Sequence, residues 1–137
     1  MTGIFVRASA LASALGPDLD SAVERLAGAP AAPALNTKTG GAWPYFAIPV
    51  AEENWRERAE AIARSVAGDL RREAALGAAQ WAALPCIVGS SSFSVGAWDD
   101  GGWAAIEPSF EFSVRLAKAF GVHGPVTAVS TTCTSGL

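Results

Sequence analysis

Cysteine and histidine are scarce in this chain: Cys86, Cys133 and His123 are their only occurrences among 137 residues. Both cysteines lie in apolar, strand-like surroundings, so the sequence gives no support for a disulfide, and we predict a reducing, cytoplasmic location. The 10 basic residues are outnumbered by 13 acidic residues, which gives a net charge of −3. A nucleic-acid partner would require a basic patch, so we expect no such partner.

Long hydrophobic runs are also lacking. No apolar run reaches the ~18 residues of a transmembrane helix, so we expect no membrane span. The N-terminus contains Arg7 but not the basic leader and apolar block of a signal peptide. Because 50% of the residues are hydrophobic, the chain can form a packed core, and its length predicts one domain or part of one.

The segments that are present alternate between strand-like and helical patterns. Short apolar runs predict strands over residues 3–10, 45–50, 84–88 and 126–130. Proline and glycine predict a loop over residues 29–44. The run Asp99-Asp100-Gly101-Gly102 predicts a solvated turn within residues 97–107 rather than a cation site, because further oxygen ligands at a suitable spacing are missing.

Three segments have helical spacing. In residues 52–76, apolar positions recur at intervals of four, three, four and four: Trp55, Ala59, Ile62, Val66 and Leu70. In residues 108–120, the positions expected to face inward are Phe110, Val114, Ala117 and Phe120, and those expected to face outward are Arg115 and Lys118. A helix over residues 21–27 would be capped by Asp18 or Asp20, with Ala22, Val23 and Leu26 inward.

The surroundings of Cys133 are the clearest chemical signal. The predicted strand over residues 126–130 runs into small hydroxyl residues, and residues 134–136 would open a helix. A thiol at such a corner lies at a helix N-terminus, where free backbone N–H groups and the helix dipole lower its pKa and can hold an oxyanion. Cys133 is therefore a candidate nucleophile, and burial as a small hydrophobic residue is the alternative. Cys86 has no polar neighbour and is predicted to fill the core.

The run Ser130-Thr131-Thr132-Cys133-Thr134-Ser135-Gly136 resembles the nucleophile motif of the β-ketoacyl-acyl carrier protein synthases, the elongating condensing enzymes of fatty acid and polyketide synthesis. The preceding run, Phe120-Gly121-Val122-His123-Gly124-Pro125, is similar to the helix end and turn that lead into that strand in the family. The resemblance implies an α/β fold of the thiolase-like layered α-β-α type. Residues 1–137 would be its N-terminal part, an incomplete domain that ends soon after the nucleophile.

For function, the resemblance implies that Cys133 accepts an acyl group from an acyl carrier protein. Malonyl on a carrier protein then loses CO₂, and the carbanion attacks the acyl-enzyme in a Claisen condensation. The loop after the strand over residues 84–88 would border the acyl pocket, so Ser92 or Phe93 would contribute to substrate binding, and packing of the loop is the alternative role for both residues. The family implies no metal or cofactor, and it implies pairing as a homodimer or a ketosynthase heterodimer.

The family also uses two histidines and a lysine, and no position of this chain matches them. His123 precedes the strand over residues 126–130, whose rise of ~3.3 Å per residue would separate it from Cys133 by more than roughly 10 Å. His123 is therefore not expected to be the base. We accordingly expect little or no condensing activity from the 137 residues alone.

Three other functions fit part of the sequence around Cys133. A non-catalytic partner subunit of the chain-length-factor type would share the fold and bind carrier protein, but such subunits usually replace the cysteine. An acyl hydrolase would use a similar elbow, but the Gly-x-Ser-x-Gly pattern is absent. An initiating synthase is usually richer in alanine than Thr134-Ser135-Gly136. Nucleotide binding is disfavoured, because the Gly89-Ser90-Ser91-Ser92 turn matches neither the Gly-x-x-x-x-Gly-Lys nor the Gly-x-Gly-x-x-Gly signature.

Overall fold

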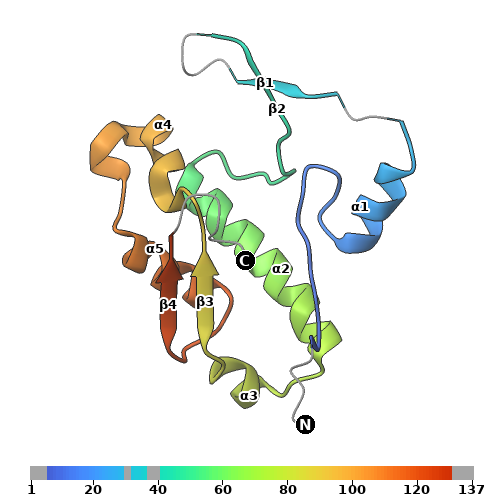
Figure 1. The fold of residues 1–137 in the computed structure, drawn as a ribbon, viewed down its shortest axis with the longest axis vertical. Coiled ribbons are helices and arrows are strands. Elements are labelled where there is room, and N and C mark those ends of the chain that lie inside the picture. The colour runs from blue at the N-terminus through green and yellow to red at the C-terminus, as the bar shows by residue number, and fades with distance from the viewer. Residues whose placement is uncertain (1–5, 30–31, 37–40, 131–137) are drawn as a thin grey trace.

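The computed structural model describes residues 6–29, 32–36 and 41–130. Its centre is formed by two helices and a parallel pair of strands (Figure 1): α2 (Trp55–Ala74), β3 (Cys86–Gly89), α5 (Ser109–Ala119) and β4 (Val126–Val129). Helix α5 packs against both strands and against α2. The chain thus combines helices and short strands, in agreement with the predicted mixed α/β class.

The parallel pairing of β3 and β4 determines the path of the chain between them. Parallel strands need a long crossover, and here it consists of η1 (Phe93–Ala97), α4 (Trp98–Gly101), η2 (Gly102–Ala105) and α5. The register places Cys86 opposite Val126 and Gly89 opposite Val129. The predicted strands over residues 84–88 and 126–130 are confirmed with slightly different bounds.

Helix α2 lies close to its neighbours because the residues it buries are alanines: Ala59, Ala63, Ala67 and Ala74. The larger residues of the predicted stripe, such as Ile62 and Val66, are only half-buried beside them. The helix begins after Asn54, whose side chain accepts a hydrogen bond from the Glu57 N–H at 2.8 Å. Its last helical residue is Ala74, and its C-cap is Ala75, which has φ +51°. The sequence predicted that the helix would be stopped by Gly77. The short helix α3 (Ala78–Ala82) follows.

Two clusters form the core. The first contains Ala59, Phe93 and Phe112, with the half-buried Val88 and Ala128 packed against them. The second contains Ala67, Trp81 and Val122, and its half-buried neighbours are Leu70, Leu76, Leu84, Cys86 and Phe120. The Trp81 indole N–H donates to the carbonyl of Phe120 at 2.8 Å, so this bulky side chain is buried with its polar group satisfied.

The predicted inward face of α5 is partly wrong. Phe110 is 58% exposed, whereas Phe112, Ser113 and Ala117 are buried. A serine can occupy this core position because its hydroxyl donates to the carbonyl of Ser109, one turn earlier, at 2.8 Å. Arg115 does not face solvent either, since it forms ion pairs with Glu60 of α2 and with Glu107.

The N-terminal region departs furthest from the expected elements. Residues 6–10, the described part of the predicted strand over residues 3–10, form no regular secondary structure. The predicted loop over residues 29–44 instead contains β1 (Ala34–Asn36), which pairs antiparallel with β2 (Trp43–Tyr45). Residues 46–50, predicted as strand, are irregular. Pro44 lies in β2, which is possible because a two-stranded hairpin consists of edge strands.

Helix α1 (Leu19–Leu26) confirms the predicted helix and its Asp18 cap, whose carboxylate accepts the Ser21 N–H at 2.8 Å. This backbone hydrogen bond lowers the pKa of Asp18 below its usual value. Ala22 is buried as expected, but Val23 and Leu26 are exposed, so the predicted inward face of this helix is largely wrong. In the described part of the chain, no helix is both long and apolar enough to cross a membrane.

Candidate functional site

The candidate nucleophile and the candidate substrate-binding residues all follow the carboxyl ends of β3 and β4 in the sequence. Gly89 and Val129 are aligned there, and the Ser90 N–H donates to the carbonyl of Val129 at 3.1 Å. The two strands therefore end side by side at the same edge of the sheet (Figure 1). Parallel strands commonly bring functional groups together at this edge, because both chains turn away from the sheet there.

Ser90 fixes the course of the loop that follows β3. Its hydroxyl oxygen accepts the backbone N–H groups of Ser92 at 3.2 Å and of Phe93 at 2.8 Å. The second hydrogen bond holds Phe93 at φ +42°, a conformation that a bulky residue rarely adopts without support. This is a side-chain turn of the kind serine forms with N–H groups two and three residues later, and its signal in the sequence is the serine that directly follows the strand.

Ser92 and Phe93, the two candidate substrate-binding residues, have different surroundings. Ser92 is exposed on the loop. Phe93 is 5% exposed and packs edge-on against Phe112, with ring centres 6.0 Å apart. The Phe93 side chain therefore anchors the loop to the core directly below the strand edge. Cys133, the candidate nucleophile, lies outside the described residues.

Trp55 connects the start of α2 to the segment that follows this loop. Its indole N–H donates to the carbonyl of Ser94 at 3.2 Å, and the Ser94 hydroxyl donates to the carbonyl of Glu107 at 2.7 Å. Gly96 passes so close to the Trp55 ring that an added Cβ would lie 2.6 Å from the indole nitrogen. Glycine at this position thus permits the contact between the crossover and α2.

Asp99 and Asp100 lie in helix α4. The solvated turn predicted within residues 97–107 is replaced by α4 and η2. One physical reason is that the Asp100 carboxylate accepts the Trp55 N–H at 2.6 Å, so it contributes to capping α2. Trp98 and Trp103 pack edge-on across this segment, with ring centres 4.7 Å apart. Among the described residues, no three His, Cys, Asp or Glu side chains are grouped as a metal site would need.

Arg115 is the main electrostatic link behind the strand edge. It forms ion pairs with Glu107 and, at 3.0 Å, with Glu60, and its guanidinium lies 5.2 Å from the centre of the Phe112 ring. Burial alone would lower the pKa of Arg115, but the hydrogen bonds that its guanidinium donates to the two carboxylates raise it. In turn, hydrogen bonding from Arg115 lowers the pKa of Glu60. Both shifts favour the charged forms of Arg115 and Glu60, and the arrangement of the ion pairs fits a structural role.

The other candidate residues of the sequence analysis lie away from this edge. His123 is exposed in the turn before β4, at the amino end of the strand. Its backbone N–H donates to the carbonyl of Ala82 at 2.7 Å. Cys86 begins β3, at the same end, and packs against the second core cluster. Burial raises the pKa of the Cys86 thiol, which keeps it protonated and unreactive at neutral pH.

Comparisons of the chain with protein-family models, with curated proteins and with solved structures found no match. The function is therefore inferred from the residues themselves. They provide a parallel strand pair with a serine-fixed loop at its carboxyl edge, and a chain that leaves β4 toward the Cys133 motif.

Proposed function

We propose that the protein supplies the acyl-accepting cysteine, Cys133, of a β-ketoacyl-acyl carrier protein synthase with a thiolase-like fold. The observation that carries the proposal is the position of β4. This strand ends at Val129, directly before the Ser-Thr-Thr-Cys-Thr-Ser-Gly run, and its carboxyl end is aligned with that of β3. In open α/β sheets, ligands commonly bind outside the carboxyl ends of the strands.

The chemistry follows from the thiol. The Cys133 thiolate attacks the carbonyl carbon of an acyl thioester on an acyl carrier protein, a new carbon–sulfur bond forms, and the carrier thiolate leaves. Malonyl on a carrier protein then loses CO₂, and its carbanion attacks the acyl-enzyme. A carbon–carbon bond forms, and the Cys133 thiolate is released. The backbone N–H of Cys133 would supply one donor to the oxyanion of each tetrahedral intermediate.

One face of the sheet is left exposed by the described residues, which supports the thiolase-like part of the proposal. Helix α5 covers one face of β3 and β4, whereas Ile87 on the opposite face is 74% exposed. Parallel sheets occur mostly with both faces covered. In a layered α-β-α arrangement, further helices or a partner ketosynthase subunit would cover this second face.

The first step is tested by measuring the intact mass after incubation with an acyl thioester. We expect an acyl adduct on the wild-type protein and on Cys86→Ala, but not on Cys133→Ala. Cys86 is a matched control, because burial raises the pKa of its thiol and makes it a poor nucleophile. An adduct that persists in Cys133→Ala and disappears in Cys86→Ala would contradict the proposal.

The second step needs groups that the chain does not supply, because the two histidines and the lysine of the family have no matching positions. We therefore expect the 137 residues to be acylated without condensing the acyl group with malonyl-acyl carrier protein. If a protein that also carries these groups is folded, binds carrier protein and is not acylated, the non-catalytic partner of the chain-length-factor type becomes the better assignment.

A further inference from the structure

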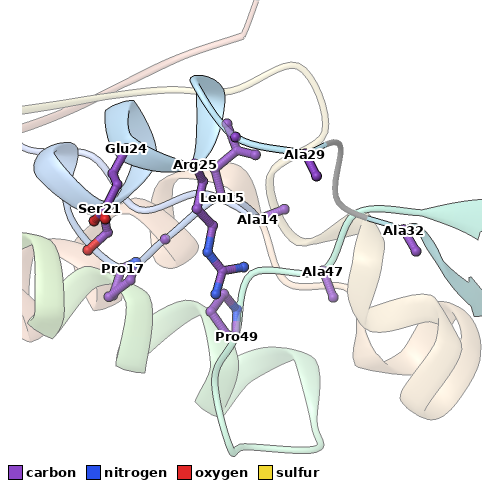
Figure 2. Close-up of a pocket in the computed structure, with 12 residues that line it drawn as sticks. Ala14, Leu15, Pro17, Ser21, Glu24, Arg25, Ala29, Ala32, Ala47 and Pro49 are labelled. Atoms are coloured by element: carbon purple, nitrogen blue, oxygen red, sulfur yellow. The ribbon is translucent and has the colours of Figure 1, made fainter.

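A cavity of about 820 Å³ lies between α1 and the irregular segment that follows β2 (Figure 2). This volume is in the range of small-molecule sites, roughly 300–1,000 Å³. Most of the lining is contributed by small or apolar residues, including Ala14, Leu15, Pro17, Ala47 and Pro49. The cavity is therefore wide enough for a small organic molecule and offers it both polar and apolar contacts.

Two opposite charges line this cavity at separate places. The Arg25 side chain extends from the last turn of α1 toward Pro49, whereas the oxygens of Glu24 and Ser21 lie together nearer to Pro17 (Figure 2). The two charged residues are adjacent in sequence, but α1 directs their side chains to different sides of the cavity. A bound molecule would thus meet a guanidinium at one end and a carboxylate at the other.

Neither charge is used to hold the fold together. Within the described residues, the side chains of Arg25 and Glu24 form no hydrogen bond or ion pair with another protein group, whereas Arg7, Arg58 and Arg115 all bind carbonyl or carboxylate oxygens. Arg25 and Glu24 are also mostly exposed at the rim of the cavity. Both groups are therefore free to bind a ligand without breaking an existing contact.

We propose that this cavity binds a small zwitterion, such as an amino acid or a short peptide, with its carboxylate on Arg25 and its ammonium group on Glu24. Guanidinium groups bind carboxylates through paired, charge-assisted hydrogen bonds. A purely anionic ligand would be repelled by Glu24, and a purely cationic ligand by Arg25. The alanine and proline lining accommodates the apolar part of the molecule.

The test is an NMR titration of the whole chain with the dipeptide Ala-Leu, compared with its N-acetylated and its C-amidated forms. We expect a dissociation constant in the millimolar range and shifts of the resonances of Ala14, Ala47 and Ala32. Removal of one charged contact, by Arg25→Gln or Glu24→Gln, should weaken binding by roughly fivefold to tenfold. Arg56→Gln, at an exposed arginine of α2, is the matched control and should leave binding unchanged.

The blocked peptides separate the two contacts. N-acetylation should remove the effect of Glu24→Gln but keep that of Arg25→Gln, and amidation should do the reverse. Because both residues are exposed, neither substitution should change the circular dichroism spectrum. Equal binding of all three peptides, or equal binding by Arg25→Gln and Arg56→Gln, would overturn the proposal.

Discussion

The region from α2 to β4 buries large apolar side chains, whereas the only apolar side chain buried among the described residues from 6 to 50 is that of Ala22. In the first region, Phe93, Phe112 and Trp81 are buried in two clusters. In the second, Leu26 is 71% exposed and Phe46 is 62% exposed. One region therefore gains its stability from burial, whereas the other has few buried residues with which to stabilise itself.

Hydrogen bonds connect the two regions at both ends of α2. The Arg7 guanidinium donates to the carbonyl of Ala74 at 2.7 Å, and the Ser9 N–H donates to the Glu73 carboxylate at 3.2 Å. Arg58 of α2 donates to the carbonyl of Ile48 at 3.4 Å. Net contributions of such bonds are small, so the N-terminal region should open locally at a lower free energy than the region from α2 to β4. The following substitutions test this difference, beginning with the largest expected effect.

Phe112→Ala should have the largest effect. Phe112 is 4% exposed, and its ring contacts Phe93, Trp55 and the Arg115 guanidinium. Its removal leaves a cavity in the first cluster and should lower the free energy of unfolding by about 3–5 kcal/mol. Phe46→Ala removes an exposed ring and should cost less than about 0.5 kcal/mol. Urea denaturation measures both values, and similar losses would contradict the comparison.

Gly96→Ala should have the second-largest effect, because the new Cβ would lie 2.6 Å from the Trp55 indole nitrogen. The crossover would have to move away from α2, at a cost of about 1–3 kcal/mol. Gly68→Ala is the matched control, because the nearest heavy atom to its added Cβ, outside the helix's own nearby backbone, is in the Arg72 side chain at 3.8 Å. In the middle of α2, alanine should stabilise by about 0.5–1 kcal/mol. Changes of the same sign in the two variants would exclude this account of Gly96.

Arg115→Ala should cost about 2 kcal/mol at neutral pH, because it leaves Glu60 and Glu107 without their common partner. The pKa of Glu60 is lowered in the folded protein, so its contribution is present above the ordinary value of 4.5 and is lost as the pH falls through the lower folded value. The difference between wild type and Arg115→Ala should therefore be constant from pH 6 to pH 8 and shrink below about pH 4. A difference that grew on acidification would contradict the ion-pair assignment.

The regions also differ in how far their structure could be predicted from the sequence. Strands 84–88 and 126–130 and helix 52–76 were predictable, because their apolar spacing is strong and tertiary packing reinforces it. The apolar spacing does not show which of Phe110 and Phe112 is buried. Two phenylalanines two positions apart face different sides of a helix, and only packing on the sheet decides which one is buried. In residues 29–50, proline and glycine obscured the hairpin of β1 and β2.

The candidate site was predictable to a similar extent. The order of strand, small residues and Cys133 could be read from the chain, and the role of Cys133 stays a prediction. The turn made by Ser90 was hidden, because its hydrogen bonds to Ser92 and Phe93 depend on the backbone course. The positive φ of Phe93 was hidden for the same reason, since sequence rules reserve that conformation for glycine or asparagine. The partly buried position of Arg115 could not be predicted, because its partner Glu60 lies 55 positions away in the sequence.

Replacement of the two helix caps should have the smallest effect and compares the regions most directly. Asn54 caps α2 and Asp18 caps α1, each by accepting a backbone N–H at 2.8 Å. Asn54→Ala should lower the global free energy of unfolding by about 1 kcal/mol, because α2 belongs to the core. Asp18→Ala should leave the global value unchanged, because α1 is attached by few buried contacts and unfolds locally.

Hydrogen exchange distinguishes these two responses. Asp18→Ala should accelerate exchange only at the amides of α1, whereas Asn54→Ala should accelerate exchange of the slowest amides in α2, α5 and β4 together. If Asp18→Ala lowered the protection of β4 as well, α1 would have to unfold cooperatively with the core. The polar contacts of Arg7 and Ser9 with the end of α2 would then couple the two regions far more strongly than hydrogen bonds at the surface ordinarily do.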